Sequence, residues 1–156
     1  AGGRAVMART GHAYMKQALR EAGAVYGGEM SAHHYFRDFY HSDSGMIPWL
    51  LVAELMGRTG KSLSALMAAK RAAFPSSGEI NFRVADIGAA MARVVAVYAP
   101  RAVFRDDSDG LSLEFADWRF NLRSSNTETL LRLNVEARHR PDLVAGAVAD
   151  IRALVG

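Results

Sequence analysis

Two kinds of hydrophobic pattern divide this chain and predict a two-part fold. We expect an α/β segment with a partial parallel sheet, followed by an α+β domain whose antiparallel sheet carries helices on one face. In residues 1–73, short apolar runs alternate with stretches of helical spacing, which is typical of strand–helix–strand units. In residues 77–156, three stretches alternate strictly between apolar and polar side chains, as strands with one buried face do. Phe74-Pro75-Ser76-Ser77-Gly78 separates the two patterns, so we place the domain boundary there.

The first half opens with a predicted strand, helix and strand. Ala5-Val6-Met7-Ala8 forms the first apolar run, and residues 14–22 carry apolar side chains at helical spacing up to Gly23. Ala24-Val25-Tyr26 is then a second buried strand, which a strand–helix–strand connection would make parallel to the first. So few strands would leave exposed sheet edges. We therefore expect further sequence upstream of Ala1 and interpret the chain as a fragment.

Two helices close the first half, and each follows a capping side chain. Asp43 or Ser44 can cap a helix that has Pro48 in its first turn, and Ser62 can cap the next one. Apolar residues in both helices recur at a spacing that predicts inward-facing sides.

The second half reads as a meander sheet with helices. Residues 79–84 form a strand, Asp86 caps a helix, and a strand from Ala102 ends at an Asp-Gly turn over residues 106–110. Three alternating strands follow, and a final helix begins at Pro141.

Composition narrows the class of protein. Half of the 156 residues are hydrophobic, which is enough to build a core, and there is no cysteine, which excludes disulfides and thiolate metal sites. No apolar run approaches the roughly 20 residues that cross a bilayer, and no secretion signal opens the chain. The net charge of +3 is too small to indicate nucleic acid. We expect a cytoplasmic protein that binds neither membranes nor nucleic acids.

The stretch from Gly27 to Phe36 holds the densest group of polar side chains. Two glycines allow positive φ and close approach of a ligand, and Glu29, Ser31, His33 and His34 follow them. A carboxylate accepts hydrogen bonds from two neighbouring hydroxyls, so a polyhydroxyl ligand such as a sugar is the first hypothesis. The alternatives are ordinary solvated side chains, or a metal site built from His33, His34, His41 and Asp43. That spacing matches no known ligand signature.

A second polar group connects two of the predicted strands. Arg123-Ser124-Ser125-Asn126-Thr127-Glu128-Thr129 has no glycine, and it offers a guanidinium, hydroxyls and an amide. Backbone N–H groups of a curved loop, together with Arg and hydroxyl groups, suit a phosphate dianion. The alternative is a polar connector whose side chains bond to their own backbone.

Together these two groups resemble a known family. Gly28-Glu29-Met30-Ser31-Ala32-His33 and Arg123-Ser124-Ser125-Asn126-Thr127-Glu128 are similar to motifs of the α-D-phosphohexomutases, in particular the bacterial phosphomannomutase/phosphoglucomutases. The resemblance implies that residues 1–73 are the later part of the third of four domains, and residues 77–156 the fourth. It also assigns two sets of substrate contacts. Glu29, Ser31, His33 and His12 would contact the sugar, and Arg123, Ser125, Asn126 and Thr127 the phosphate. Thr129 stands where the family usually has proline.

The resemblance also implies an activity for an intact parent enzyme. Such enzymes interconvert hexose 1-phosphates and 6-phosphates through a phosphoserine, with Mg²⁺, a hexose 1,6-bisphosphate as activator and intermediate, and in general a monomeric state. The serine loop and the Asp-rich Mg²⁺ loop are absent from this sequence. We therefore expect the metal site and the N-terminal domains to lie outside this chain, and the chain alone to be inactive. The alternatives are a relative that acts on an amino sugar phosphate, such as phosphoglucosamine mutase, and a non-catalytic phosphosugar- or anion-binding module.

Overall fold

The computed structural model describes residues 2–125 and 128–156, which fall into two compact units, Ala1–Leu66 and Met67–Gly156. We describe each unit by itself. Within the described ranges, no helix has both the length and the apolar character needed to span a membrane. The predicted domain limits of 1–73 and 77–156 stay a prediction.

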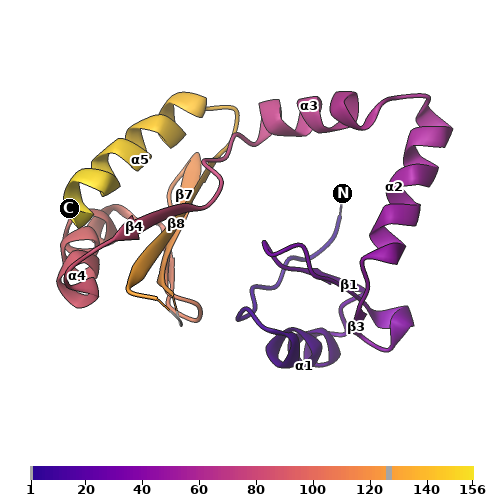
Figure 1. Ribbon diagram of the computed structural model, residues 1–156, viewed down its shortest axis with the longest axis horizontal. Helices are drawn as coiled ribbons and strands as arrows, with labels where there is room; N and C mark the ends of the chain where they lie inside the picture. Colours follow the sequence, from indigo (N-terminus) through magenta and orange to yellow (C-terminus); the bar gives the residue numbers. More distant parts are fainter. Residues whose placement is uncertain (1, 126–127) are drawn as a thin grey trace. The chain divides into compact units, whose positions relative to one another are not determined.

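The first unit packs one helix against a small antiparallel sheet. Helix α1 (His12–Ala22) is followed by strands β1 (Tyr26–Gly28), β2 (His34–Phe36) and β3 (Ser42–Asp43), with the short 3-10 helix η1 (Arg37–Phe39) before β3 (Figure 1). Gly23 ends α1 in the left-handed region at φ 58°, as predicted. Three buried side chains form the centre of the unit: Met15, Leu19 and Tyr35.

The predicted parallel sheet is wrong for the residues that the structure describes. Residues 5–8 have no regular secondary structure, and Val6 and Met7 are exposed. The second predicted strand begins later, at Tyr26, and β1 pairs antiparallel with β2. A nearby hairpin partner costs less chain entropy than a partner reached through a crossover helix, so the local pairing forms here.

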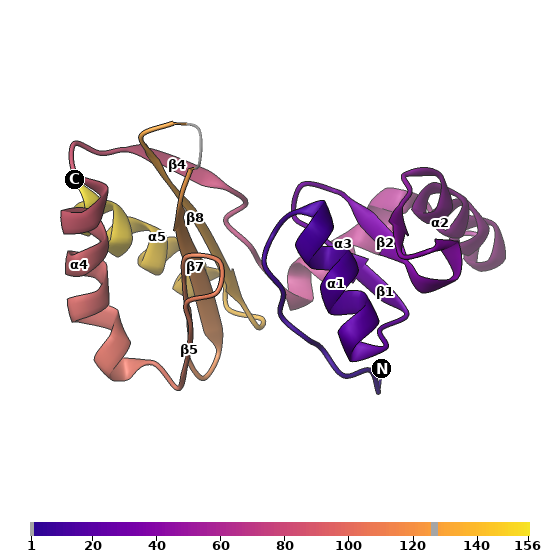
Figure 2. The same cartoon turned by 90° about the horizontal axis from the view of Figure 1, so that it is seen from below.

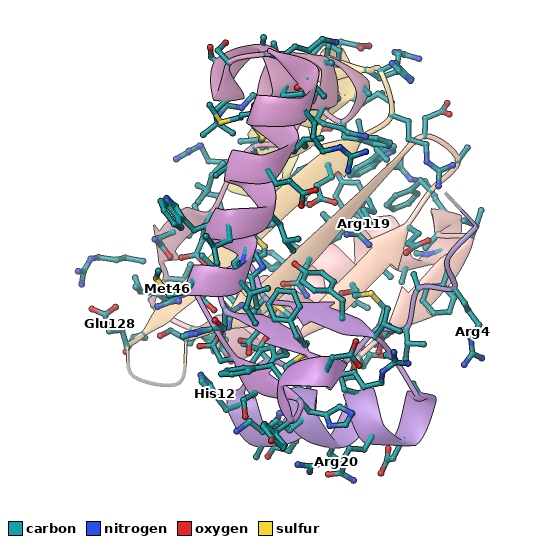
Figure 3. The ribbon with its side chains drawn as sticks, turned by 90° about the vertical axis from the view of Figure 1, so that its right-hand side faces the viewer. Arg4, His12, Arg20, Met46, Arg119 and Glu128 are labelled. Carbon is teal, nitrogen blue, oxygen red and sulfur yellow. The ribbon has the colours of Figure 1, made fainter. Side chains whose placement is uncertain are left out.

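Helices α2 (Met46–Thr59) and α3 (Leu63–Ala73) begin close to the predicted capping residues, although the N-cap position of α2 is Gly45 rather than Asp43 or Ser44. The backbone N–H of Ile47 donates to Ser44 Oγ at 3.3 Å, and that of Ala65 donates to Ser62 Oγ at 3.3 Å. The expected inward packing of their apolar faces is wrong within the described ranges, where neither helix has a buried residue. Met46, at the start of α2, is among the exposed side chains (Figure 3). Spacing predicts which face is apolar, but burial also needs a partner surface.

The second unit is a five-stranded antiparallel sheet with helices on one face (Figure 2). Its strands are β4 (Ile80–Arg83), β5 (Phe104–Asp106), β6 (Leu111–Glu114), β7 (Trp118–Ser124) and β8 (Leu130–Ala137), in the order β4-β8-β7-β6-β5. Helices α4 (Ile87–Tyr98) and α5 (Pro141–Val155) pack against it, and the 3-10 helix η2 (Ala99–Arg101) follows α4. The α+β prediction is confirmed for this unit.

The alternating strands bury one side as the sequence predicts. Leu111, Leu113, Phe120 and Leu122 are each at most 2% exposed, and the polar residues between them lie on the other face. At the start of α4, Asp86 Oδ1 accepts the backbone N–H of Ala89 at 3.0 Å, which confirms the predicted cap. This core supports β7 and β8, whose ends carry the second polar loop.

Candidate functional site

The first polar group lies on the hairpin that joins β1 to β2. The backbone N–H of Glu29 donates to the His33 carbonyl at 3.0 Å, and that of Ala32 donates to the Glu29 carbonyl at 3.0 Å. Ala32 occupies the left-handed region at φ 65°, which lets the chain turn back at this point. The turn therefore holds the backbones of Glu29 and His33 side by side.

The two glycines before Glu29 act differently from the prediction. Both lie within β1, and neither is among the described residues with positive φ. A Cβ on Gly27 would lie 2.7 Å from Leu19 Cδ1 and 2.9 Å from Met15 Cε. Gly27 thus allows the hairpin to pack closely on α1.

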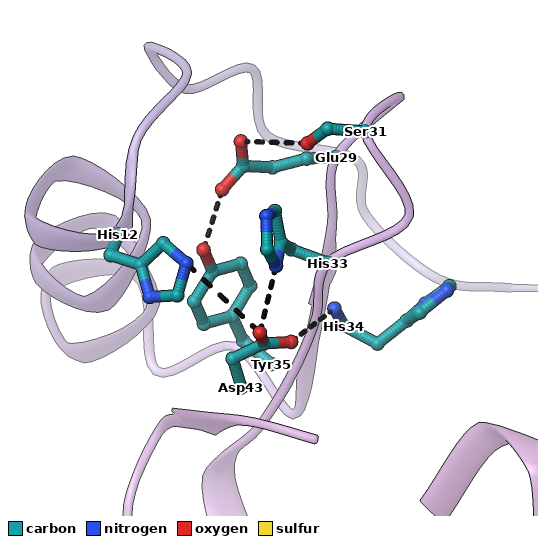
Figure 4. Close-up of polar contacts among 7 residues, drawn as sticks. All are labelled: His12, Glu29, Ser31, His33, His34, Tyr35 and Asp43. Atoms are coloured by element: carbon teal, nitrogen blue, oxygen red, sulfur yellow. Dashed lines mark hydrogen bonds and ion pairs between the residues drawn. The ribbon is translucent and has the colours of Figure 1, made fainter. Parts of the chain in front are cut away.

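A buried tyrosine orients the Glu29 carboxylate (Figure 4). The Tyr35 hydroxyl donates to Glu29 Oε1 at 2.6 Å, and the Ser31 hydroxyl lies at a longer 3.5 Å from Oε2. Burial raises the pKa of the Tyr35 hydroxyl, and the Glu29 carboxylate raises it further, so this hydroxyl stays a donor at neutral pH. Each carboxylate oxygen can accept more than one hydrogen bond, so Glu29 keeps capacity for two ligand hydroxyls.

Asp43 organises the histidines beside Glu29. Its Oδ1 accepts the backbone N–H of His34 at 2.8 Å, while its Oδ2 lies 2.8 Å from His33 Nδ1 and 4.0 Å from His12 Nε2. The His34 N–H lowers the pKa of the Asp43 carboxyl below its ordinary value, and the His33 ring adds to this effect. The His12 and His33 rings meet edge to face at 4.7 Å between centroids. Side chains from α1, the hairpin and β3 therefore form one group.

Sequence reasoning found part of this group and missed the rest. It predicted His12, Glu29, Ser31 and His33, all of which lie in the group, but it gave no site role to Tyr35. Because His33 and Tyr35 are two residues apart next to a strand, their shared face was a usable signal.

The set of possible metal ligands also differs from the one predicted. Within the described ranges, the donor set is His12, His33 and Asp43, without His34 or His41. The His34 ring bonds instead to the Tyr26 hydroxyl at 2.7 Å.

The second polar group begins at the end of β7. Arg123 Nη2 lies 3.6 Å from Glu79 Oε2, and Arg132 Nη1 lies 3.7 Å from Glu79 Oε1. Arg123 and Arg132 are directly opposite each other in the β7–β8 ladder. Glu79 therefore offsets the repulsion between two neighbouring guanidinium groups, a role that no local pattern indicates.

The turn between β5 and β6 also touches Arg123. A Cβ on Gly110 would lie 2.5 Å from Arg123 Cβ and 2.8 Å from its Cα, so only glycine fits at this point. Beyond β7, the backbone N–H of Ser125 donates to the Leu130 carbonyl at 2.9 Å, and Thr129 is exposed. The predicted contacts Asn126 and Thr127 lie outside the described residues.

Family models match both halves of the chain. The model described as "Phosphoglucomutase/phosphomannomutase, alpha/beta/alpha domain III" matches residues 1–74, and "Phosphoglucomutase/phosphomannomutase, C-terminal domain" matches residues 79–154. The chain belongs to the phosphoglucomutase/phosphomannomutase family.

Individual relatives agree with these models. A phosphomannomutase of Salmonella montevideo is 58% identical over 155 residues, which are 99% of this chain and 34% of the relative. Proteins named phosphohexose mutases from Xanthomonas campestris are 55% identical, over 99% of this chain and 35% of their own length. The crystal structure of a phosphoglucomutase/phosphomannomutase family protein from Burkholderia thailandensis matches with a TM-score of 0.74 and 30% identity, covering 98% of this chain and 32% of that one. The chain thus spans about one third of the length of these relatives.

Proposed function

We propose that this chain supplies the sugar-hydroxyl and phosphate contacts of a phosphomannomutase/phosphoglucomutase. The reaction of the whole enzyme would interconvert a hexose 1-phosphate and the 6-phosphate through a phosphoserine and a hexose bisphosphate. The observation that carries the proposal is the Glu29 carboxylate, held from one side by the buried Tyr35 hydroxyl at 2.6 Å.

A fixed carboxylate suits a reaction in which the sugar must bind in two orientations. Two adjacent ring hydroxyls can donate to Glu29 whichever end of the hexose carries the reacting phosphate. Ser31 and the two imidazoles of His12 and His33 lie beside Glu29 and would donate to, or accept from, further hydroxyls. Holding the sugar in this way reduces the entropy lost on reaching the reactive geometry, so the role of the hairpin is alignment.

The phosphate contacts would come from the β7–β8 loop. Arg123 can form a bidentate pair with a phosphate dianion, and Ser125, Asn126 and Thr127 would complete the shell. Arg123 lies 3.6 Å from Glu79, which also pairs with Arg132. Two arginines and one glutamate leave these three side chains with a net positive charge. This net positive charge favours an anionic ligand over a neutral sugar.

Mg²⁺, which the family's chemistry implies, does not fit the donor set found here. His12, His33 and Asp43 offer two imidazole nitrogens and one carboxylate, whereas Mg²⁺ prefers six oxygen ligands. We therefore derive no step through Mg²⁺ in this chain and propose that its site and the reactive serine lie in other parts of the enzyme. The chain alone should then bind ligand without turning it over.

Calorimetric titration of the 156-residue chain tests the binding roles. We expect glucose 1-phosphate to bind more tightly than inorganic phosphate, and Glu29→Gln to remove most of that difference while leaving phosphate binding unchanged. Arg123→Ala should weaken both ligands. Equal affinity of the wild-type chain for the two ligands would overturn the sugar contact.

An activity assay tests the division of labour. Hexose 1-phosphate with Mg²⁺ and a hexose 1,6-bisphosphate should give no isomer when only this chain is present. Measurable turnover that Glu29→Gln abolishes would refute the proposal that the reactive groups lie elsewhere.

A further inference from the structure

Three side chains with metal-binding atoms converge in the first unit from three separate elements. His12 begins α1, His33 directly precedes β2, and Asp43 ends β3. One donor atom of each lies within 4.8 Å of the other two (Figure 4). We propose that His12, His33 and Asp43 together bind a single transition-metal dication, with Zn²⁺ as the best-suited ion.

The chemistry of the donors favours this class of ion. Two imidazole nitrogens and one carboxylate oxygen, with a position left open, form a ligand set that suits Zn²⁺. In a tetrahedral Zn²⁺ site with bonds of about 2.0–2.1 Å, ligand atoms lie about 3.3 Å apart. The His33 Nδ1–Asp43 Oδ2 distance of 2.8 Å and the His12 Nε2–Asp43 Oδ2 distance of 4.0 Å fall on either side of that separation. Small rotations of the rings would equalise the two distances.

The surroundings allow those rotations and fix the carboxylate. The side chains of His12 and His33 are 52% and 41% exposed, so solvent leaves both rings room for small rotations, and the His12 ring keeps an edge-to-face contact with Tyr35 at 5.3 Å between centroids. Asp43 is held differently, because its Oδ1 accepts the His34 backbone N–H at 2.8 Å and its Oδ2 is thereby directed at the imidazoles. Such outer hydrogen bonds orient metal ligands and strengthen metal binding. The metal would replace the hydrogen bond between His33 and Asp43.

Metal at this position would have a consequence for the sugar. His12 and His33 belong to the proposed sugar contacts, so a bound Zn²⁺ would occupy the atoms that a hexose needs. This consequence rests on the proposed function, whereas the metal site does not.

Calorimetric titration with Zn²⁺ tests the site on the full 156-residue chain without a polyhistidine tag. We expect one saturable Zn²⁺ site and no comparable binding of Mg²⁺. His12→Ala and Asp43→Asn should each weaken Zn²⁺ binding by about tenfold or more. His34→Ala is the matched control, because it removes an imidazole from the same hairpin whose ring faces Tyr26, and it should change the affinity less than threefold.

Two results would overturn the site: absence of saturable Zn²⁺ binding, or a loss in His34→Ala as large as that in His12→Ala. Circular dichroism shows whether the Asp43→Asn variant stays folded. If it does not, the Zn²⁺ affinity of His12→Ala, whose substitution lies at an exposed position, decides whether the site binds metal. Titration of glucose 1-phosphate before and after one equivalent of Zn²⁺, corrected for Zn²⁺ binding to the ligand alone, tests the competition. If metal-free protein fails to bind glucose 1-phosphate, the proposed function fails and the Zn²⁺ result still stands.

Discussion

Replacement of Tyr35 by phenylalanine isolates the hydrogen bond that orients Glu29. The ring is fully buried, and Phe keeps its packing on Met15 and Leu19, so the variant loses only the 2.6 Å bond from the hydroxyl. Hydrogen bonds to charged groups contribute about 1.5–3 kcal/mol. Glu29 is only partly buried, so water can replace the hydroxyl, and we expect a loss at or below the lower limit of that range, about 1–1.5 kcal/mol.

Amide hydrogen exchange measures this loss where it occurs. The N–H groups of Glu29 and Ala32 close the hairpin turn, so their exchange reports its opening free energy. A loss of about 1–1.5 kcal/mol predicts exchange faster by about fivefold to thirteenfold in Tyr35→Phe. The control is Tyr26→Phe, which removes a 2.7 Å bond to His34 at an exposed position and should have a smaller effect. Unchanged exchange in Tyr35→Phe, or an equal effect in Tyr26→Phe, would refute the reasoning.

Further predictions concern single groups in each unit. Gly110→Ala should cost about 2–4 kcal/mol of unfolding free energy in urea, because φ is +76° and the new Cβ meets the backbone of Arg123. Gly27→Ala should cost less, about 1 kcal/mol, because its Cβ meets only the ends of two flexible side chains; an equal or larger cost would contradict this difference. Glu79→Gln should lower stability by about 0.5–1 kcal/mol, and more at low than at high salt, because it leaves two facing arginines unneutralised; a loss independent of salt would argue against the charge effect. The lowered pKa of Asp43 means that its stabilising contribution is complete above the ordinary Asp value of about 3.9 and disappears as pH falls through the lower folded value. Amide hydrogen exchange of the hairpin in Asp43→Asn should therefore be faster than in wild type at pH 6, and the two should become similar under strongly acidic conditions. A difference that stays constant with pH would exclude this linkage.

The pH dependence of the Tyr35–Glu29 hydrogen bond follows from the raised pKa of the Tyr35 hydroxyl. A folded-state pKa above the ordinary tyrosine value of about 10 means that the contribution is complete below that value and is lost progressively as pH rises from there through the folded value. Hairpin protection in wild type should thus persist past pH 10, and the advantage over Tyr35→Phe should shrink only at higher pH. Loss of the advantage already at pH 9 would contradict the raised value.

The sequence by itself determined those features whose causes are local. Strict alternation identified β6, β7 and β8 of the second unit, which are neighbours in an antiparallel meander with short connections. Ser62 and Asp86 marked helix starts, and Ser44 marked the start of α2 to within one residue, because such a side chain bonds to backbone only two or three residues away. The polar residues of the hairpin were also readable, since one short segment contains Glu29, Ser31 and His33.

Only the tertiary structure decided which distant residues share a site. Asp43 reaches His33 and His12 through the pairing of β2 with β3 and the packing of α1, and Glu79 reaches Arg123 because β4 lies beside β8. The antiparallel pairing of Tyr26–Gly28 likewise depends on which strand is available nearby, a choice that apolar spacing does not encode. Periodicity reports which side of an element is apolar, but the partner of that side is set by the free energy of packing the whole unit.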